Sequence, residues 1–514
     1  MSVNHNDCKT VSSEQGIVGK SSKTVGKTEE TMKRAIDERV NVKPIFSNVV
    51  HTGIWEGPCR VGTREELDPE YEKRTGREQC KKWFEELKAN ISPEYANLLE
   101  PAYIEYPENF YISDETFSSL KPDLNETDIF LFTYRLPGIE RLGKPMSMIN
   151  NGPAPVDLGA FYSDIGHEFY FGHDYEEYNE ILKLLQVRKA VRNTKVLVLT
   201  AGEQFPVSVN SSNPDLFGLN LKYGIRSARR SIKDVFPVMQ ALDMENEIAA
   251  KAAELVDGAV ESHIKKEWVA CDIRYCEAVK AMMEELGCNA FTTACKELCA
   301  SRLPAKNNCT PCLTHALLKD SGIPCACEED LNVWMAVMIF MYLSRKSVFM
   351  GNPSLVHAHK RPIEDLGMSR LLSGPADGFD EDVLEIRHAV PSRKLEGLDK
   401  PDMPYELGHF TLEGWGTKVQ VDMSKGSEDT VTIGRFSRDG GSLMVTRGKI
   451  LGCAYRDIEC SPAVYYKVEG GAREFRHALA EGHYGHHLAV VYGDYVNELK
   501  ALGKIVGFKV EHHK

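Results

Sequence analysis

Apolar residues concentrate between positions 309 and 359, where they predict a buried helix flanked by two short strands. Residues Leu331 to Ser344 are apolar on every side of a helix, so this helix is expected to lie between two layers. The apolar runs Ile323 to Cys327 and Ser347 to Met350 predict the strands before and after it. Polar residues at the ends of these elements are therefore the first candidates for chemistry.

Three consecutive carboxylates, at positions 328 to 330, follow the first of these strands. Asp330 is expected to cap the helix, because its carboxylate can accept the free amides of the first turn. Open α/β sheets bind their ligands beyond the carboxyl ends of the strands. The side chains expected to face one cleft there are those of Glu328, Asn352, His357 and His359.

Alternation of strand and helix patterns along the chain predicts an α/β fold class. We expect two doubly wound α/β domains, followed by a β-rich, antiparallel, barrel-like C-terminal domain. The expected divisions are a flexible N-terminal tail over 1–42, an N-terminal α/β domain over 43–190, a central α/β domain carrying the metal-site acid over 191–355, and a β-rich domain with a terminal histidine motif over 356–514.

The individual elements follow from the same periodicities. Helices are predicted over 77–90, 175–191, 245–261, 265–286, 313–319 and 494–503. Strands are predicted over 129–134, 145–149, 195–200, 289–295, 383–388, 410–412, 418–423, 430–435, 442–448, 464–468 and 488–492. A turn of small residues at 201–205 is expected to close the strand over 195–200.

Length and charge narrow the possible partners. At 514 residues the chain is too long for one core, and its formal charge of -13 argues against binding the backbone of nucleic acids. The longest apolar run, residues 331–343, is shorter than the roughly 20 residues of a membrane span. The first residues carry no apolar signal core. We therefore expect a soluble, cytoplasmic protein that binds neither nucleic acid nor membrane.

Cysteine is abundant, with 14 residues in the chain and nine of them between Cys271 and Cys327. One interpretation is a set of reduced, mostly buried thiols, since free cysteine packs as a small hydrophobic residue. The other is zinc or redox chemistry at the Cys309-x-x-Cys312 pair, although a zinc site would need a second close pair.

A histidine cluster, His483, His486 and His487, stands immediately before the predicted strand over 488–492. Either one of these histidines binds a metal, or all of them are solvated or hydrogen-bonded residues of a loop. A carboxylate and an imidazole that arrive from distant parts of a chain form a ligand set suited to manganese, iron, cobalt or zinc. Glu328 and one of these histidines are the candidates for such a set.

Three segments resemble the L-fucose isomerase and L-arabinose isomerase superfamily. They are Gly322 to Asp330 with the buried helix that follows, Phe349 to Pro353, and Gly485 to Asp494. The resemblance implies a divalent metal, usually Mn²⁺, that chelates two neighbouring oxygens of a sugar while acids move a proton between C1 and C2 through a cis-enediol. It also implies a homo-oligomer, commonly a hexamer. Glu328 matches the metal-binding and acid/base glutamate, and His487 matches the C-terminal histidine ligand, with His486 as the other register.

Asn352 departs from the family pattern, which has a second acid 24 positions after the first (352 − 328 = 24). An amide can offer its oxygen to a metal but cannot take a proton. Either another group supplies the base, or the reaction needs only one base, as in an epimerisation, an elimination or a hydride shift. The candidates for the other group are Glu329, Asp330, His359 and Glu385.

The expected function is therefore a metal-dependent aldose–ketose isomerase acting on a sugar or sugar derivative. The alternatives are epimerase or lyase-type chemistry on the same scaffold, or a non-catalytic sugar-binding homologue. Arg387 and Arg393 either line the cleft, where they would favour a phosphate- or sulfonate-bearing substrate, or are solvated. Trp415 either stacks on a sugar ring or packs in a core.

Overall fold

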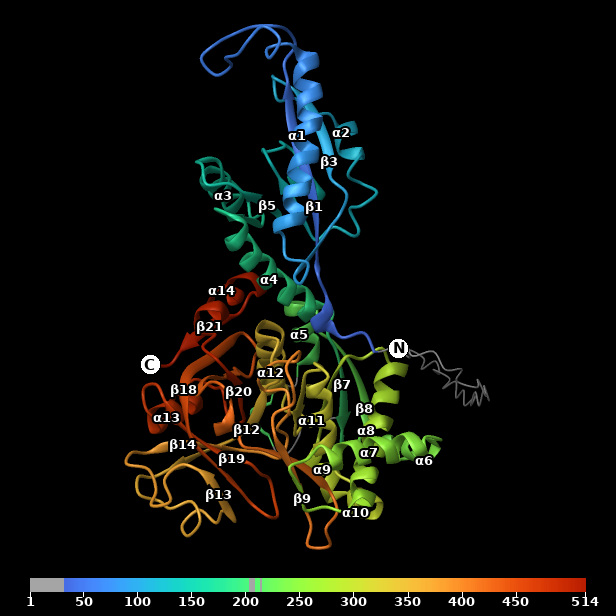
Figure 1. Ribbon diagram of the computed structural model, residues 1–514, viewed down its shortest axis with the longest axis vertical. Helices are drawn as coiled ribbons and strands as arrows, with labels where there is room; N and C mark the ends of the chain where they lie inside the picture. The colour runs from blue at the N-terminus through green and yellow to red at the C-terminus, as the bar shows by residue number, and fades with distance from the viewer. Residues whose placement is uncertain (1–31, 203–208, 213–214) are drawn as a thin grey trace, which may run out of the picture. The chain divides into compact units, whose positions relative to one another are not determined.

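The computed structural model describes residues 32–202, 209–212 and 215–514, and Figure 1 traces its elements in chain order. Most of the expected tail lies outside the described residues, as do residues 203–205 of the turn expected after the strand over 195–200. The last part of that tail has regular structure, because η1 (Ala35–Asp37) and β1 (Val40–Val50) begin before residue 43. Contacts join residues 33–514 into one unit.

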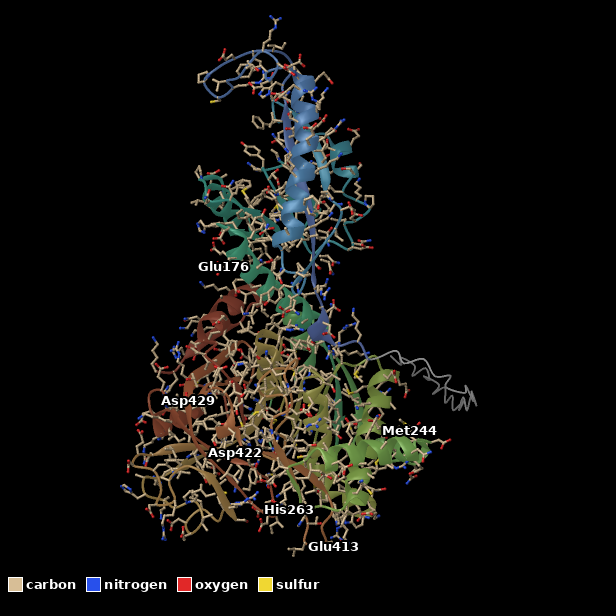
Figure 2. The ribbon with its side chains drawn as sticks, viewed as in Figure 1. Glu176, Met244, His263, Glu413, Asp422 and Asp429 are labelled. Atoms are coloured by element: carbon tan, nitrogen blue, oxygen red, sulfur yellow. The ribbon has the colours of Figure 1, made fainter. Side chains whose placement is uncertain are left out.

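The first sheet consists of parallel strands in the order β2-β1-β4-β5-β6, with β3 also paired to β1. Two predicted strands and two predicted helices are confirmed here, as β4, β5, α1 and α4. Glu176, in the first turn of α4, is exposed (Figure 2). The elements are β2 (Ala96–Leu98), β3 (Ala102–Pro107), β4 (Ile129–Phe132), β5 (Met146–Ile149), β6 (Phe169–Gly172), α1 (Pro69–Asn90), α2 (Asp114–Ser118), η2 (Ile139–Leu142), α3 (Ala154–Asp164) and α4 (Tyr175–Arg192).

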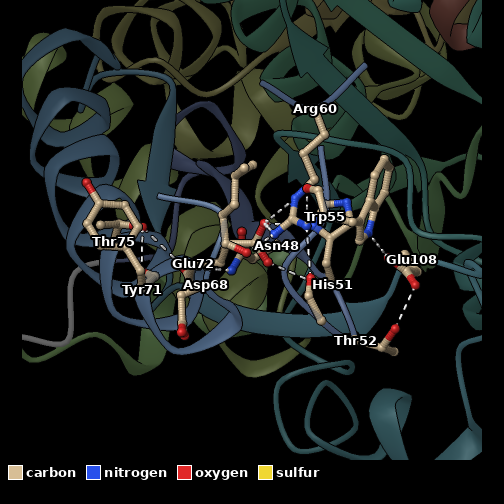
Figure 3. A network of polar contacts seen from close by, with 12 residues as sticks. Asn48, His51, Thr52, Trp55, Arg60, Asp68, Tyr71, Glu72, Thr75 and Glu108 are labelled. Carbon is tan, nitrogen blue, oxygen red and sulfur yellow. Dashed lines mark hydrogen bonds and ion pairs between the residues drawn. The ribbon is translucent and has the colours of Figure 1, made fainter. Parts of the chain in front are cut away.

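A polar network fixes the long connection between β1 and α1 (Figure 3). Glu72 Oε1 accepts a hydrogen bond from Arg60 Nη2 at 2.8 Å and lies 2.7 Å from His51 Nδ1. Arg60 is 8% exposed and also donates to the backbone oxygens of Gly53 and Leu67. One buried guanidinium therefore holds a segment that has little regular structure of its own.

The second sheet is also parallel, in the order β11-β10-β7-β8. The predicted strand over 195–200 is confirmed to the residue as β7, and the predicted helices over 245–261, 265–286 and 313–319 correspond to α7, α8 and α11. The elements are β7 (Lys195–Thr200), β8 (Arg226–Ser231), β10 (Ala290–Thr293), β11 (Cys325–Cys327), α5 (Leu216–Tyr223), α6 (Val235–Ala241), α7 (Glu245–Asp257), α8 (Lys266–Glu285), α9 (Cys295–Ala300), α10 (Leu303–Asn307) and α11 (Cys312–Asp320).

A closed antiparallel barrel of six strands forms the C-terminal part of the fold. Its order is β18-β17-β20-β12-β14-β19, and the pairing of β19 with β18 closes the ring. The strands are β12 (Phe349–Val356), β14 (Val383–Arg387), β17 (Thr430–Phe436), β18 (Ser442–Tyr455), β19 (Ala463–Val468) and β20 (Leu488–Tyr492). The strand predicted over 347–350 was expected to end at Gly351-Asn352-Pro353, but β12 runs through these residues, because Gly351 pairs with β20 and Asn352 and Pro353 pair with β14.

Smaller elements surround the barrel. The strand predicted over 410–412 is wrong, because β15 ends at His409 and a hairpin loop follows. The remaining elements are β13 (Arg370–Ser373), β21 (Lys509–His512), β9 (Glu261–Ser262), β15 (Tyr405–His409), β16 (Thr417–Val421), η3 (Met423–Lys425), α13 (Ala472–Glu481) and α14 (Val496–Val506).

The helix α12 (Leu331–Ser344) joins the second sheet to the barrel. It packs against β11 on one side and against the barrel strands β17 and β20 on another, with α4 as a further neighbour. Every residue of α12 from Leu331 to Leu343 is buried, as the sequence predicts. Asp330 caps the helix by accepting hydrogen bonds from the amides of Asn332 and Val333. The carboxylates at positions 328–330 therefore lie where the parallel sheet meets the barrel.

Candidate metal centre

Glu328, His388 and His487 form a buried group whose possible ligand atoms all lie within 4.8 Å of one another. Glu328 Oε1 is 3.6 Å from His388 Nε2 and 3.7 Å from His487 Nε2. These separations are too long for hydrogen bonds. They suit two atoms bound to one ion, because such ligands lie about 2.0–2.2 Å from the metal.

Three of the four imidazole nitrogens of this group have no hydrogen bond to any described residue. In the described part of the chain, these are Nδ1 and Nε2 of His388 and Nε2 of His487, although both rings are buried. Buried polar atoms in folded proteins almost always have a partner. A divalent cation held by Glu328 and both imidazoles would satisfy Nε2 of each ring, so these residues fit such an ion.

Glu328 reaches the group because the chain turns sharply at the end of β11. Glu328 and Glu329 both have left-handed backbone conformations, with φ of 62° and 52°. Such conformations are uncommon outside glycine and cost about 1–3 kcal/mol each. His487, which immediately precedes β20, is also left-handed, with φ of 64°. Two candidate ligands thus stand at strand ends on a strained backbone, a placement that is concentrated at functional sites.

A second carboxylate orients His487. Nδ1 of His487 lies 2.9 Å from Asp330 Oδ2. The same oxygen also accepts a hydrogen bond from Arg435 Nη1 at 2.6 Å. An ionised carboxylate only accepts, so Nδ1 of His487 carries a proton. Although burial opposes it, Asp330 and Glu328 raise the pKa of His487, so a cation at Nε2 would bind in competition with a proton. Arg435 is fully buried and donates to the backbone oxygen of His487 as well, at 3.1 Å.

Electrostatics prepare the group to bind a cation. Burial acts to raise the pKa of Glu328, but His388 and His487 outweigh it and hold this pKa well below its usual range. Burial lowers the pKa of His388, so its imidazole is neutral and can act as a ligand. Although burial opposes the charge, Arg435 and His487 lower the pKa of Asp330 to about 2. The site therefore combines two carboxylates with one neutral imidazole and one imidazole that Asp330 keeps in a fixed orientation.

Glu329 points toward the parallel sheet. Its carboxylate lies 3.7 Å from Arg229 Nη2 on β8, and its amide donates to the backbone oxygen of Thr293 at the end of β10. Burial raises the pKa of Glu329 to about 7, against smaller lowering effects from Thr200 and Arg229. A carboxyl group that can change its protonation near neutral pH therefore stands directly beside Glu328 at the carboxyl edge of this sheet.

Asn352, the third predicted ligand, lies half-buried on β12, directly opposite Arg387 of β14. Two positions earlier, Met350 Sδ accepts a hydrogen bond from the amide of Cys327, the residue before Glu328. Side chains two apart on a strand share a face. The face of β12 that carries Asn352 therefore turns toward the end of β11.

The weaker predicted residues separate into two groups. His486 is exposed at the surface, its ring centroid is 4.4 Å from that of His487, and partial burial of its ring lowers its pKa to about 4. Arg387 immediately precedes His388, so it also lies beside the centre. His359, by contrast, is an exposed loop residue.

Arg393 and Trp415 make other contacts. Arg393 donates to Asp320 Oδ2 at 2.7 Å and lies 2.9 Å from Asp402, so two carboxylates already neutralise its guanidinium. Trp415 belongs to the loop between β15 and β16, where its Nε1 donates to Glu413 Oε2 at 3.1 Å. Figure 2 shows Glu413 at the outer tip of this loop.

His388 is the member of the group that the sequence did not single out as a ligand. It follows β14 directly, as Glu328 follows β11, so a polar residue at the end of a buried strand was the available signal. The sequence singled out the preceding residue, Arg387, as one that could line the cleft, but not His388 itself. Its assignment to the centre depends on barrel pairings between distant strands, which one sequence does not reveal.

Two further features bear on metal binding. The described cysteines are free thiols, and burial raises the pKa of both Cys309 and Cys312. No cysteine belongs to a potential metal group in the described part of the chain. Glu261, His263 and Glu406 form a second, more exposed group, but Arg370 contacts both of its carboxylates and supplies the positive charge there.

Comparison with protein-family models and with curated proteins gave no match. Over the residues that are described, each helix is too short or too polar to cross a membrane.

Proposed function

We propose that the chain is a divalent-metal-dependent aldose–ketose isomerase. The observation that carries this proposal is the buried group of Glu328, His388 and His487, in which imidazole nitrogens without hydrogen bonds converge on a charged carboxylate. One carboxylate and two imidazoles suit manganese, iron, cobalt or zinc, and the sequence resemblance favours Mn²⁺. When bound, such an ion polarises a sugar carbonyl and stabilises the negative charge that develops on the neighbouring oxygen.

The chain's own residues have distinct parts in this proposal. Glu328, His388 and His487 hold the ion, and three protein ligands leave coordination positions for two adjacent sugar oxygens. Asp330, held by Arg435, keeps Nε2 of His487 directed at the ion. The buried helix α12 and the closed barrel keep water from the other sides of the centre.

Proton transfer needs a further group, because Asn352 cannot take a proton. Among the alternatives, Asp330 is used by Arg435, His487 and the amides of α12. His359 is exposed on a loop, and Glu385 lies within β14, where it pairs with Ser354 and Tyr465 on the neighbouring strands. We therefore assign proton transfer at the sugar carbon to the carboxyl of Glu329, which stands at the same sheet edge as Glu328. Asn352 would instead bind a sugar hydroxyl, since its amide can both donate and accept.

The test begins with metal removal. Dialysis against a chelator should abolish conversion of aldoses to ketoses across a panel of D- and L-aldoses, and Mn²⁺ should restore it. Isothermal titration should give one Mn²⁺ site per chain in the wild-type protein and none in Glu328→Gln. Glu176→Gln, the same change at an exposed position of α4, should behave as the wild type.

Other outcomes assign the alternatives. Exchange of the hydrogen at C2 with solvent, without a ketose product, would replace the isomerase by epimerase or lyase-type chemistry. Metal binding with neither exchange nor product on any sugar would indicate a non-catalytic sugar-binding protein. Absence of metal binding in the wild type would overturn the proposal itself.

A further inference from the structure

A cluster of polar side chains lies next to the candidate metal centre, on the face shared by β12, β14 and β19. Across these strands Ser354 pairs with Glu385, and Glu385 pairs with Tyr465. Leu384 and Ile386, which alternate with Glu385 along β14, belong to the hydrophobic core on the opposite face. Glu385 and Tyr465 are 4% and 0% exposed, so both are buried, and the Tyr465 ring packs against Phe379 with centroids 5.1 Å apart.

Three hydrogen-bond donors of this polar cluster have no acceptor among the described residues. They are Arg387 Nη1, Arg456 Nε and the hydroxyl of Tyr465, each buried and without a hydrogen-bond partner among the residues that are described. The charges of Arg387 and Arg456 both act on Glu385 and on Tyr465, so the four groups are neighbours. An unpaired buried donor costs about 1–3 kcal/mol, and three together are uncommon in a folded protein.

Glu385 alone does not satisfy these donors. The nearest approach of its carboxylate to Arg387 is 3.8 Å, between Oε1 and Nε, which is beyond hydrogen-bond distance. Burial raises the pKa of Glu385, so this carboxylate contributes less negative charge to the cluster. Arg456 is partly paired, because its Nη1 donates to Glu459 and its Nη2 to the backbone oxygen of Leu366. Its Nε, Arg387 Nη1 and the Tyr465 hydroxyl still have no acceptor among the described residues, a combination suited to an oxygen-rich anion.

Two residues, Arg387 and Asn352, place the polar cluster beside the metal centre. Arg387 is the residue before His388, so the guanidinium and the ligating imidazole leave the same strand end. Asn352 lies directly opposite Arg387, on the face of β12 that turns toward Glu328. A sugar bound at the centre would therefore extend past Asn352 toward Arg387.

We propose that Arg387, Arg456 and Tyr465 bind an anionic group of the substrate, so that the substrate is an acidic aldose. The anion is a carboxylate, phosphate or sulfonate at the end of the sugar away from its carbonyl. This inference rests on the proposed function for the reaction, but the anion site itself can be measured without metal or turnover. Arg393, the other arginine considered from the sequence, is neutralised by Asp320 and Asp402 and takes no part.

The first experiment measures anion binding alone. With EDTA present, inorganic phosphate and sulfate should raise the melting temperature of the wild-type protein in a saturable way, at constant ionic strength. The shift should be lost in Arg387→Gln and reduced in Tyr465→Phe, which removes a single hydroxyl and keeps the ring. Arg476→Gln, an exposed change on α13, should retain the full shift. No saturable shift in the wild type, or an equal shift in Arg387→Gln, overturns the proposal, and a weak shift common to all variants identifies an adventitious ion only.

The second experiment measures selectivity. Each aldose of a D and L panel is compared with its own uronate and its own terminal phosphate in the Mn²⁺-loaded protein. The acidic member of the preferred pair should show at least tenfold higher kcat/KM, and Arg387→Gln should reduce that ratio to less than twofold, whereas Arg476→Gln should keep the wild-type ratio. The better of the two acids distinguishes a carboxylate site from a phosphate site.

The two proposals fail differently. Metal-dependent turnover of neutral aldoses without any preference for acidic ones would overturn the anion site and leave the isomerase intact. Anion binding that depends on Arg387, in a protein that binds no Mn²⁺, would overturn the isomerase and leave the anion site.

Discussion

His487 donates a hydrogen bond from Nδ1 to Asp330 Oδ2 at 2.9 Å, although the two residues are 157 positions apart in the chain. Arg435 donates to the same oxygen at 2.6 Å, and all three side chains are fully buried. The carboxylate of Asp330 also caps α12 with its other oxygen. One acid therefore fixes the start of the buried helix and the orientation of a metal ligand from the last part of the chain.

Asp330→Asn is expected to damage both stability and metal binding. The amide removes the negative charge that faces Arg435, and loss of one partner of a buried ion pair costs about 3–5 kcal/mol. Because His487 then loses the group that orients it, Mn²⁺ affinity should fall about 10–100-fold. Urea unfolding and isothermal titration measure the two effects.

Asp174→Asn is the matched control for this change. Asp174 caps α4 by accepting from the amide of Glu177, and asparagine caps a helix about as well as aspartate. Its unfolding free energy and Mn²⁺ affinity should therefore match the wild type. A folded Asp330→Asn protein with wild-type Mn²⁺ affinity would contradict the role given to Asp330.

The sequence predicts best where the structure depends on local interactions. The helix α12 and its cap Asp330 were predicted to the residue, because a continuous apolar run that follows an acid is a strong local signal. By contrast β8, with the sequence Arg-Ser-Ala-Arg-Arg-Ser, carries no apolar pattern and was not predicted. It is a strand because it forms the edge of the second sheet, where only its pairing with β7 is required.

The candidate site shows the same division. Glu328 and His487 were predicted as metal ligands, and the structure brings their side chains together. Asn352 was expected at the end of a strand, but pairing with Arg387 keeps it within β12. His388 joins the group only because β14 lies beside β12 in a closed barrel, an arrangement that no local pattern encodes.

His388→Gln is expected to weaken Mn²⁺ binding more than a change in a supporting residue would. The side chain keeps most of its volume but loses the imidazole nitrogen that lies 3.6 Å from Glu328. Affinity should fall by more than the roughly 10–100-fold that removal of an orienting group costs. His486→Gln, which alters a neighbouring ring outside the group, should change the affinity less than threefold. If the two substitutions reduced Mn²⁺ affinity equally, His388 would not be a ligand of the metal.

Glu329→Gln separates proton transfer from metal binding. The amide is nearly the same size as the carboxyl group but cannot exchange a proton. Ketose formation should fall by about 10²–10⁴-fold, the usual contribution of a general acid or base, while Mn²⁺ affinity stays within threefold of the wild type. Isothermal titration and a coupled ketose assay give both values on one preparation. Undiminished turnover would transfer the role to another group.

Asn352→Asp tests the departure from the family pattern. A carboxylate at this position would add a charged oxygen beside the centre and a group that can take a proton. Ketose formation should be preserved or increased, and Mn²⁺ affinity should rise, whereas the exposed change Asn109→Asp should alter neither. Complete loss of turnover in a folded Asn352→Asp protein would show that the amide has a role of its own, such as binding a sugar hydroxyl.

Lys319 holds the segment that follows His388. Its ammonium group is fully buried and donates to the backbone oxygens of Val348, just before β12, and of Val390, two residues after His388. Burial lowers its pKa to about 8. The ammonium group that joins these two segments therefore loses its proton at a lower pH in the folded protein than in the unfolded chain.

Stability should depend on pH through this lysine. Its folded-state pKa of about 8 lies below the usual lysine pKa of 10.5, so between these values the unfolded chain holds a proton that the folded chain has released. Stability from this group therefore rises with pH across that window. The unfolding free energy of the wild type minus that of Lys319→Met should increase by about 3 kcal/mol between pH 8 and pH 10.5. Subtraction cancels the tyrosines and cysteines common to both proteins, and Lys82→Met controls for the loss of a surface charge. If urea unfolding gave a difference that does not change with pH, burial would not lower the pKa of Lys319 in the folded protein.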